Sequence, residues 1–204
     1  MTKIPPGKII SVKEHFEHVL QQAKTCQLCA EQLPLEPRAI IQGSSTAKLL
    51  IVGQAPGIRA HNANRPWNDP SGERLRSWLG LTEAQFYDET KIAILPMGFC
   101  YPGTGKSGDL PPLKMCAVTW HKRLTALMKI EKILLIGQYA QQYYLQDKLT
   151  VTQRLQQSSS YPSQYLLMPH PSPRNNRWLK QHPWFEGKHL PLIQKQVFKL
   201  LIHE

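Results

Sequence analysis

The sequence predicts an α/β protein with three layers, in which a four-stranded, mostly parallel sheet is covered by helices on both faces. Two observations support this fold class. Short apolar runs recur along the chain, and segments with the helical spacing of apolar residues lie between them. Strands that are apolar throughout are typical of parallel sheets, because helices bury both of their faces. The 204 residues suffice for one sizeable core, and we expect a single domain over 1–204.

The predicted elements alternate in a regular order. Each expected strand is a short apolar run, and Pro96 cuts the second of them short. Each expected helix repeats apolar residues every three or four positions, as Leu75, Trp78 and Leu79 do, and the first one leads into a Cys-x-x-Cys motif. The strands are expected at 47–53, 91–99, 132–138 and 164–170, and the helices at 11–32, from 71 onwards, at 114–128, from 139 onwards and at 190–202.

Three of the expected strands are followed by loops rich in polar and aromatic residues. These loops cover 54–67, 96–100 and 170–176. Ligands of open α/β sheets bind beyond the carboxyl ends of the strands. We therefore expect the functional site at this edge of the sheet.

The composition indicates a folded, basic protein. Lys and Arg number 25 against 14 Asp and Glu, which gives a formal net charge of +11 at pH 7. The hydrophobic fraction of 41% and the charged fraction of 19% are ordinary for a globular domain, and they exclude a disordered or fibrous chain. The excess charge favours an anionic partner, with nucleic acid ahead of an anionic membrane surface. Charge that serves solubility alone is the alternative.

The N-terminal segment and the apolar runs bear on the compartment. The segment lacks the continuous apolar core of a secretory signal, and no run approaches the roughly 18 apolar residues of a membrane span. We therefore expect a cytoplasmic protein with no membrane partner.

Four cysteines form one close pair and one wide pair. Cys26 and Cys29 are spaced C-x2-C, whereas Cys100 and Cys116 are spaced C-x15-C around a loop rich in Pro and Gly. In a reducing compartment such thiols are metal ligands or core residues rather than disulfides. A zinc ribbon would offer two short knuckles, whereas the wide pair suits a [4Fe–4S] cluster held by four thiolates. Zinc and the absence of any metal remain alternatives.

The loop after the first strand has features of a ligand site. The sequence Gly-Gln-Ala-Pro-Gly at 53–57 presents backbone N–H groups in a tight turn, and its glycines let a ligand approach the main chain. Trp67 follows Pro66 and is positioned to stack on a flat ring. The alternative is that Trp67 packs against the helix that begins near Ser71.

These residues resemble a known family. Gly-Gln-Ala-Pro-Gly at 53–57, Arg-Pro-Trp at 65–67 and Gly72 are similar to the first motif of the uracil-DNA glycosylase superfamily, in the branch that carries an iron–sulfur cluster. His-Pro-Ser-Pro at 170–173 resembles the second motif, and the cysteine spacing is similar to the cluster ligands of that branch. The resemblance implies a monomeric DNA glycosylase of base excision repair, which flips uracil or another deaminated base out of single- or double-stranded DNA and hydrolyses its N-glycosidic bond. It also implies a structural [4Fe–4S] cluster on the four cysteines.

The resemblance further implies roles for individual residues. His170 would donate a hydrogen bond to the departing base, and Trp67 would stack on it. Gln54, Ala55, Gly57 and Pro96 would form the rest of the base pocket, and Arg174 and Asn175 would contact DNA. Apart from the resemblance, Lys106 lies in the loop that Cys100 and Cys116 close, and a cluster that braces this basic loop would add Lys106 to the surface that contacts DNA.

The sequence departs from the branch at two positions. The branch is rich in carboxylates just after the first motif, but here Ile58 to Asn62 contain none, so His61 or Asn62 is expected to polarise the attacking water. Asp69 is the nearest carboxylate in sequence. Pro96 occupies the position of the base-reading Asn and carries no amide, which weakens the prediction of uracil specificity. A weakly active or inactive relative that binds DNA is therefore the alternative function, and a hydrolase or transferase of free nucleosides or nucleotides is a third.

Overall fold

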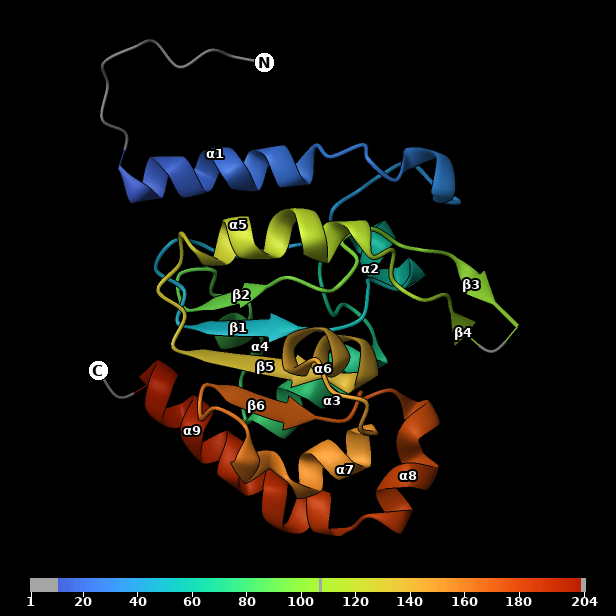
Figure 1. The fold of residues 1–204 in the computed structure, drawn as a ribbon, viewed down its shortest axis with the longest axis vertical. Helices are drawn as coiled ribbons and strands as arrows, with labels where there is room; N and C mark the ends of the chain where they lie inside the picture. The colour runs from blue at the N-terminus through green and yellow to red at the C-terminus, as the bar shows by residue number, and fades with distance from the viewer. Residues whose placement is uncertain (1–10, 107, 203–204) are drawn as a thin grey trace.

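A computed structural model describes residues 11–106 and 108–202 and contains a four-stranded, fully parallel sheet (Figure 1). Its strands pair in register through residues such as Leu50 with Ala93 and Leu134 with Leu166. The predicted strands are confirmed, although each is shorter than its apolar run. In the order β2-β1-β5-β6, the strands are β2 (Ile92–Ile94), β1 (Leu49–Val52), β5 (Lys132–Ile136) and β6 (Tyr165–Met168).

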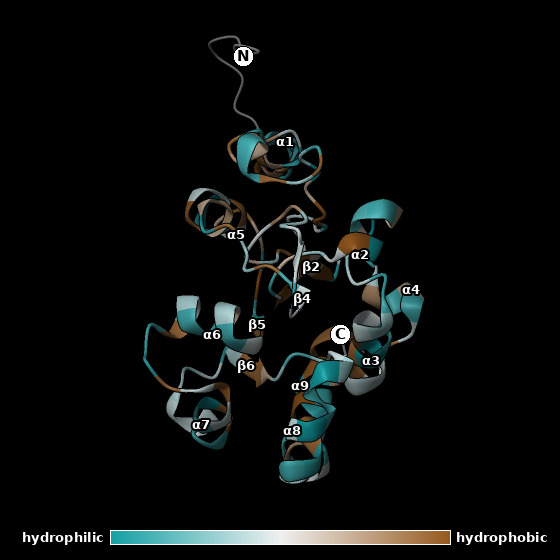
Figure 2. Ribbon diagram, turned by 90° about the vertical axis from the view of Figure 1, so that its right-hand side faces the viewer, coloured by the Kyte–Doolittle hydropathy of each residue, from teal (hydrophilic) through white to brown (hydrophobic). Residues whose placement is uncertain are grey.

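Helices cover both faces of the sheet, as predicted. Figure 2 shows α5, α6 and α7 on one side of the sheet and α3, α4 and α9 on the other. The first helix, α1, packs on α5 rather than on the sheet. The three-layer fold buries β1 and β2 completely. The α-helices of the described residues are α1 (Val12–Lys24), α2 (Ile58–Ala63), α3 (Pro70–Leu79), α4 (Glu83–Phe86), α5 (Lys122–Thr125), α6 (Gly137–Leu145), α7 (Val151–Gln156), α8 (Asn176–Gln181) and α9 (Leu190–Ile202).

Two helices differ from the prediction. The first ends at Lys24 rather than at 32, because the chain leaves helical geometry at Thr25, whose hydroxyl donates back to the carbonyl of Gln21. The segment 114–128 is not one α-helix. It contains the π-helical turn Ala117–His121 and then α5, and the wide turn brings His121 to the end of β2.

The helix α3 matters most for the site. Asp69 caps its N-terminus by accepting a hydrogen bond from the N–H of Gly72 at 2.8 Å, and Pro70 occupies its first turn. It ends at Gly80, which adopts the left-handed conformation that glycine tolerates. The start of α3 therefore holds Asp69 next to the loop that follows β1.

The loops after β1, β2 and β6 meet at the carboxyl edge of the sheet. A small antiparallel hairpin of β3 (Thr104–Gly105) and β4 (Gly108–Asp109) lies beyond this edge (Figure 1). Within 11–106 and 108–202, none of the helices combines the length and the apolar composition that a membrane span requires.

Candidate active site

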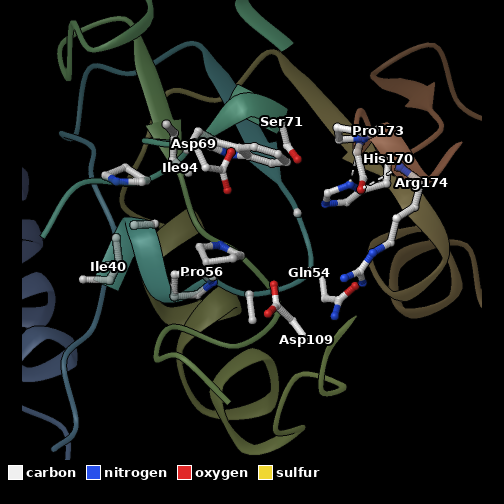
Figure 3. Close-up of a pocket in the computed structure, with 18 of the residues that line it drawn as sticks. Ile40, Gln54, Pro56, Asp69, Ser71, Ile94, Asp109, His170, Pro173 and Arg174 are labelled. Carbon is white, nitrogen blue, oxygen red and sulfur yellow. Dashed lines mark hydrogen bonds between the residues drawn. The ribbon is translucent and has the colours of Figure 1, made fainter. Parts of the chain in front are cut away.

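A pocket of about 470 Å³ opens at the carboxyl edge of the sheet (Figure 3). Its walls come from segments far apart in the sequence, because parallel strands bring their carboxyl ends together. Its volume lies in the range of small-ligand sites. The lining includes Gln54, Ala55, Gly57, Trp67, Asp69, Pro96, Asp109, His170, Arg174 and Asn175.

The loop from Gly53 to Gly57 forms one wall of the pocket. Two of its carbonyl oxygens, those of Gly53 and Gln54, accept hydrogen bonds from the N–H groups of Met97 and Gly98, both at 2.9 Å. Among the described residues, the N–H groups of Gln54 and Ala55 donate to no backbone carbonyl. They are therefore available to bind a carbonyl oxygen of a ligand.

Trp67 is held in the pocket from two sides. Its indole lies against Gly53, where a Cβ atom would stand 2.7 Å from Cζ2 of the ring. Its carbonyl lies against Gly72, where a Cβ atom would stand only 1.8 Å from the oxygen. Trp67 also adopts a left-handed φ of 54°, which costs about 1–2 kcal/mol for a residue with a side chain. Gly53 and Gly72 of the first motif thus fix the ring of Trp67 in the pocket wall, on a backbone that is strained.

His170 follows β6 and faces Trp67, with ring centroids 5.5 Å apart. Its Nδ1 accepts a hydrogen bond from the N–H of Ser172 at 3.2 Å, so the proton of the neutral ring is on Nε2. Desolvation lowers the pKa of His170, while Asp69 and Asp109 oppose this shift. The side chain is therefore a neutral donor that can offer Nε2–H to a ligand.

The structure does not bring His61 and Asn62 to the pocket. His61 lies on α2 and is only 6% exposed, with its ring 6.0 Å from that of Tyr101, and Asn62 is exposed to solvent. The predicted role of these two residues in polarising water therefore has no support in the geometry. Two carboxylates line the pocket instead, those of Asp69 and Asp109.

Pro96 lines the pocket, as expected, and a buried histidine, His121, holds its carbonyl group in place. Its carbonyl accepts a hydrogen bond from Nε2 of His121 at 3.0 Å, while Nδ1 of His121 receives the hydroxyl of Tyr144 at 2.9 Å. Burial lowers the pKa of His121 to about 4, so this ring is neutral. The network fixes the end of β2, but Pro96 gives the pocket no side-chain donor for a base.

The hairpin and the loop after His170 meet at the pocket entrance. The guanidinium of Arg174 packs on Gly108, where a Cβ atom would stand 1.4 Å from Nη1. Lys106 belongs to the same hairpin turn, and Asn175 donates to the carbonyl of His170 at 2.7 Å. The amide of Gln54 donates to the carbonyl of Leu110 at 3.1 Å and ties the hairpin to the pocket wall. The three predicted DNA-contacting residues thus lie on one side of the molecule.

The four cysteines are free thiols that lie near one another. The N–H of Phe99 donates to Sγ of Cys116 at 3.4 Å. Burial and the three other cysteines raise the pKa of Cys116 to about 12. In the described part of the chain, no three His, Cys, Asp or Glu side chains are grouped as ligands of one metal ion. Four neighbouring thiols with an N–H donor to sulfur nevertheless match the donor chemistry of an iron–sulfur cluster.

The fold and the pocket define a three-layer α/β protein with an aromatic, hydrogen-bonding cleft at the carboxyl edge of its sheet. Residues 40–194 match the family model of the uracil DNA glycosylase superfamily, and the chain belongs to this superfamily. The chain is also similar to a protein from Methanosarcina acetivorans, described provisionally as a uracil DNA glycosylase and solved by solution NMR. The two are 15% identical, the match covers 77% of this chain and 94% of the other, and the TM-score is 0.45.

Proposed function

We propose that this protein is a DNA glycosylase that removes uracil or another deaminated base from DNA. The observation that carries the proposal is the pairing of a fixed aromatic ring, Trp67, with a neutral donor, His170, whose ring centroid lies 5.5 Å away in the same pocket. Such a pair can stack on a flipped base and stabilise the negative charge that the base carries as it leaves.

In the proposed reaction, the residues of the pocket have separate roles in base binding, leaving-group stabilisation and positioning of water. The base stacks on Trp67, and its carbonyl oxygens accept hydrogen bonds from Nε2 of His170 and from the loop N–H groups of Gln54 and Ala55. Because the pocket is recessed, these bonds are stronger than in water and favour departure of the base anion. Asp69 supplies a carboxylate for the attacking water: one oxygen caps α3 and the other faces the pocket near Gly57.

The basic side of the pocket entrance supports DNA as the partner. Arg174 and Lys106 come from two different segments and lie beside the pocket, on a chain of net charge +11. Lys and Arg bind phosphates without reading sequence, and their contacts weaken as salt rises. A flipped base would reach the pocket while this side holds the backbone.

A cluster on Cys26, Cys29, Cys100 and Cys116 completes the proposal. A [4Fe–4S] group would brace the segment after α1 against the loop that carries the hairpin, and its role is structural. Protein purified without oxygen should then contain iron and sulfide. The Cys100→Ala variant should contain neither iron nor sulfide. Stoichiometric zinc in the wild-type protein would instead show that the four cysteines bind zinc and not an iron–sulfur cluster.

The proposed activity is tested on labelled oligonucleotides that carry one uracil, hypoxanthine or xanthine, in single- and double-stranded form. Alkali cleaves the abasic sites that a glycosylase leaves, so a cut at the lesion reports base release. We expect a cut with at least one of these bases. If no lesion is cut although the protein binds DNA in a salt-sensitive manner, the protein is a DNA-binding relative without glycosylase activity. The proline at position 96 favours this alternative, because it carries no amide to read a base.

A further inference from the structure

Asp109 contributes the second carboxylate of the pocket. Asp109 lies on β4 of the hairpin, 52 positions beyond Gly57, yet it lines the same pocket (Figure 3). No acidic residue follows Gly57 directly, where the family resemblance leads one to expect carboxylates. The tertiary structure therefore supplies a carboxylate at this place from a distant segment.

Gly57 provides independent evidence for the position of Asp109. Its backbone, with φ −78° and ψ 172°, is extended and open to any residue, so conformation does not require glycine there. A Cβ atom on Gly57 would stand 3.1 Å from Oδ2 of Asp109, which is a tight contact, and 4.0 Å from Oδ2 of Asp69, which is an ordinary one. The missing side chain leaves room for two carboxylate oxygens that approach the same point.

In each carboxylate, one oxygen accepts a hydrogen bond from the protein and the other faces the pocket. Oδ1 of Asp109 accepts a hydrogen bond from the hydroxyl of Thr104 at 3.2 Å, and that hydroxyl is paired with the hydroxyl of Tyr101 at 2.6 Å. Oδ1 of Asp69 accepts from the N–H of Gly72. In both cases the second oxygen is directed to the space above Gly57. Both carboxylates also raise the pKa of His170 against the effect of burial, in keeping with their place in the same pocket.

We infer that Asp109 is a second catalytic carboxylate, which holds the attacking water together with Asp69 above Gly57. The inference rests on the proposed glycosylase function. The water oxygen bonds to the sugar carbon C1′ as the bond from C1′ to the base nitrogen breaks, and the electrons of that bond leave with the base. One water proton passes to Oδ2 of Asp109 and then to solvent, and the base anion, held by His170, takes a proton from solvent.

The first experiment compares Asp109→Asn with the wild type and with Glu17→Gln. The asparagine keeps the size of the side chain but cannot take a proton, and Glu17 is an exposed residue of α1 whose replacement removes the same charge far from the pocket. Single-turnover release of the preferred base and affinity for DNA with an abasic-site analogue are measured. We expect Asp109→Asn to slow release by about 10²-fold or more, with affinity within about threefold of wild type.

Double variants test whether the two carboxylates share one water. If they do, Asp69→Asn combined with Asp109→Asn loses much less than the product of the two single losses. Gly57→Ala should slow release by on the order of tenfold by crowding Oδ2 of Asp109, and it should add little in an Asp109→Ala background.

The outcomes separate the inference from the proposed function. Release by Asp109→Asn at the rate of Glu17→Gln overturns the inference alone, as does a loss confined to DNA affinity. A wild type that releases no base from any lesion overturns both.

Discussion

Replacement of Gly72 by alanine is a sharp test of how the pocket is built. The new Cβ atom would stand 1.8 Å from the carbonyl oxygen of Trp67 and 2.6 Å from its carbonyl carbon. These are backbone atoms, so no rotation of a side chain relieves the overlap, and the segment from Trp67 to the first turn of α3 must move. Crowding of this kind costs about 1–3 kcal/mol. Loss of the hydrogen bond from Gly72 to Asp69 adds about 0.5–2 kcal/mol.

The expected loss of unfolding free energy is therefore roughly 1.5–5 kcal/mol, measured by urea denaturation. For a domain of this size the loss lowers Tm by roughly 3–20 °C. Gly187→Ala is the control, because a Cβ atom there meets nothing within 4 Å. Base release should fall as well, since Trp67 loses its place in the pocket wall. An unfolding midpoint of Gly72→Ala equal to that of the wild type would refute the contact between α3 and Trp67.

Three further predictions address chemistry, DNA binding and pH. His170→Ala should slow single-turnover base release by on the order of 10²-fold or more, because it removes the donor to the leaving base; a rate equal to wild type would contradict that role. Arg174→Ala with Lys106→Ala should lower the slope of log affinity against log salt by about two on duplex DNA, and an unchanged slope would remove both residues from the interface. The pKa of His121 is about 4, below its ordinary value near 6.5, so between these values the unfolded chain binds a proton that the folded chain does not. As pH drops from 7 to 4, the unfolding free energy of the wild type should therefore fall by roughly 3 kcal/mol more than that of His121→Gln, measured by urea denaturation. Equal losses in the two proteins would contradict a buried, neutral His121.

Much of the site could be predicted from residues that lie at strand ends. The motif at 53–57 and His170 follow apolar runs, and parallel strands place such residues at one edge of the sheet. Trp67 could be predicted as a ring-stacking residue, but its left-handed backbone and its support by Gly72 depend on packing. Trp67 packs against Gly53 and Gly72, so the spacing of these glycines from Trp67 in the motif determines where the ring lies.

The two carboxylates that we propose for the attacking water differ in how far the sequence indicates them. Asp69 is the nearest acidic residue after the first motif, whereas Asp109 is 52 positions beyond Gly57. His61 and Asn62 are close to the first motif in sequence, but α2 turns His61 into the interior and Asn62 toward solvent. Asp109 lies in a two-residue strand with no periodic signal, within a loop bounded by cysteines. Only the pairing of β3 with β4 and the contact with Gly57 reveal it.

The sequence by itself determined the parallel sheet, the helices on both faces and the edge at which the pocket lies. These depend on local patterns, because hydrophobic periodicity selects strands and helices and a parallel sheet has one carboxyl edge. The tertiary structure decided where helices stop, which of the polar residues near the motif face the pocket, and that Asp109 joins Asp69 above Gly57. Contacts between distant segments depend on packing across the whole chain, and no local pattern encodes the few ångströms that bring two carboxylates to one point.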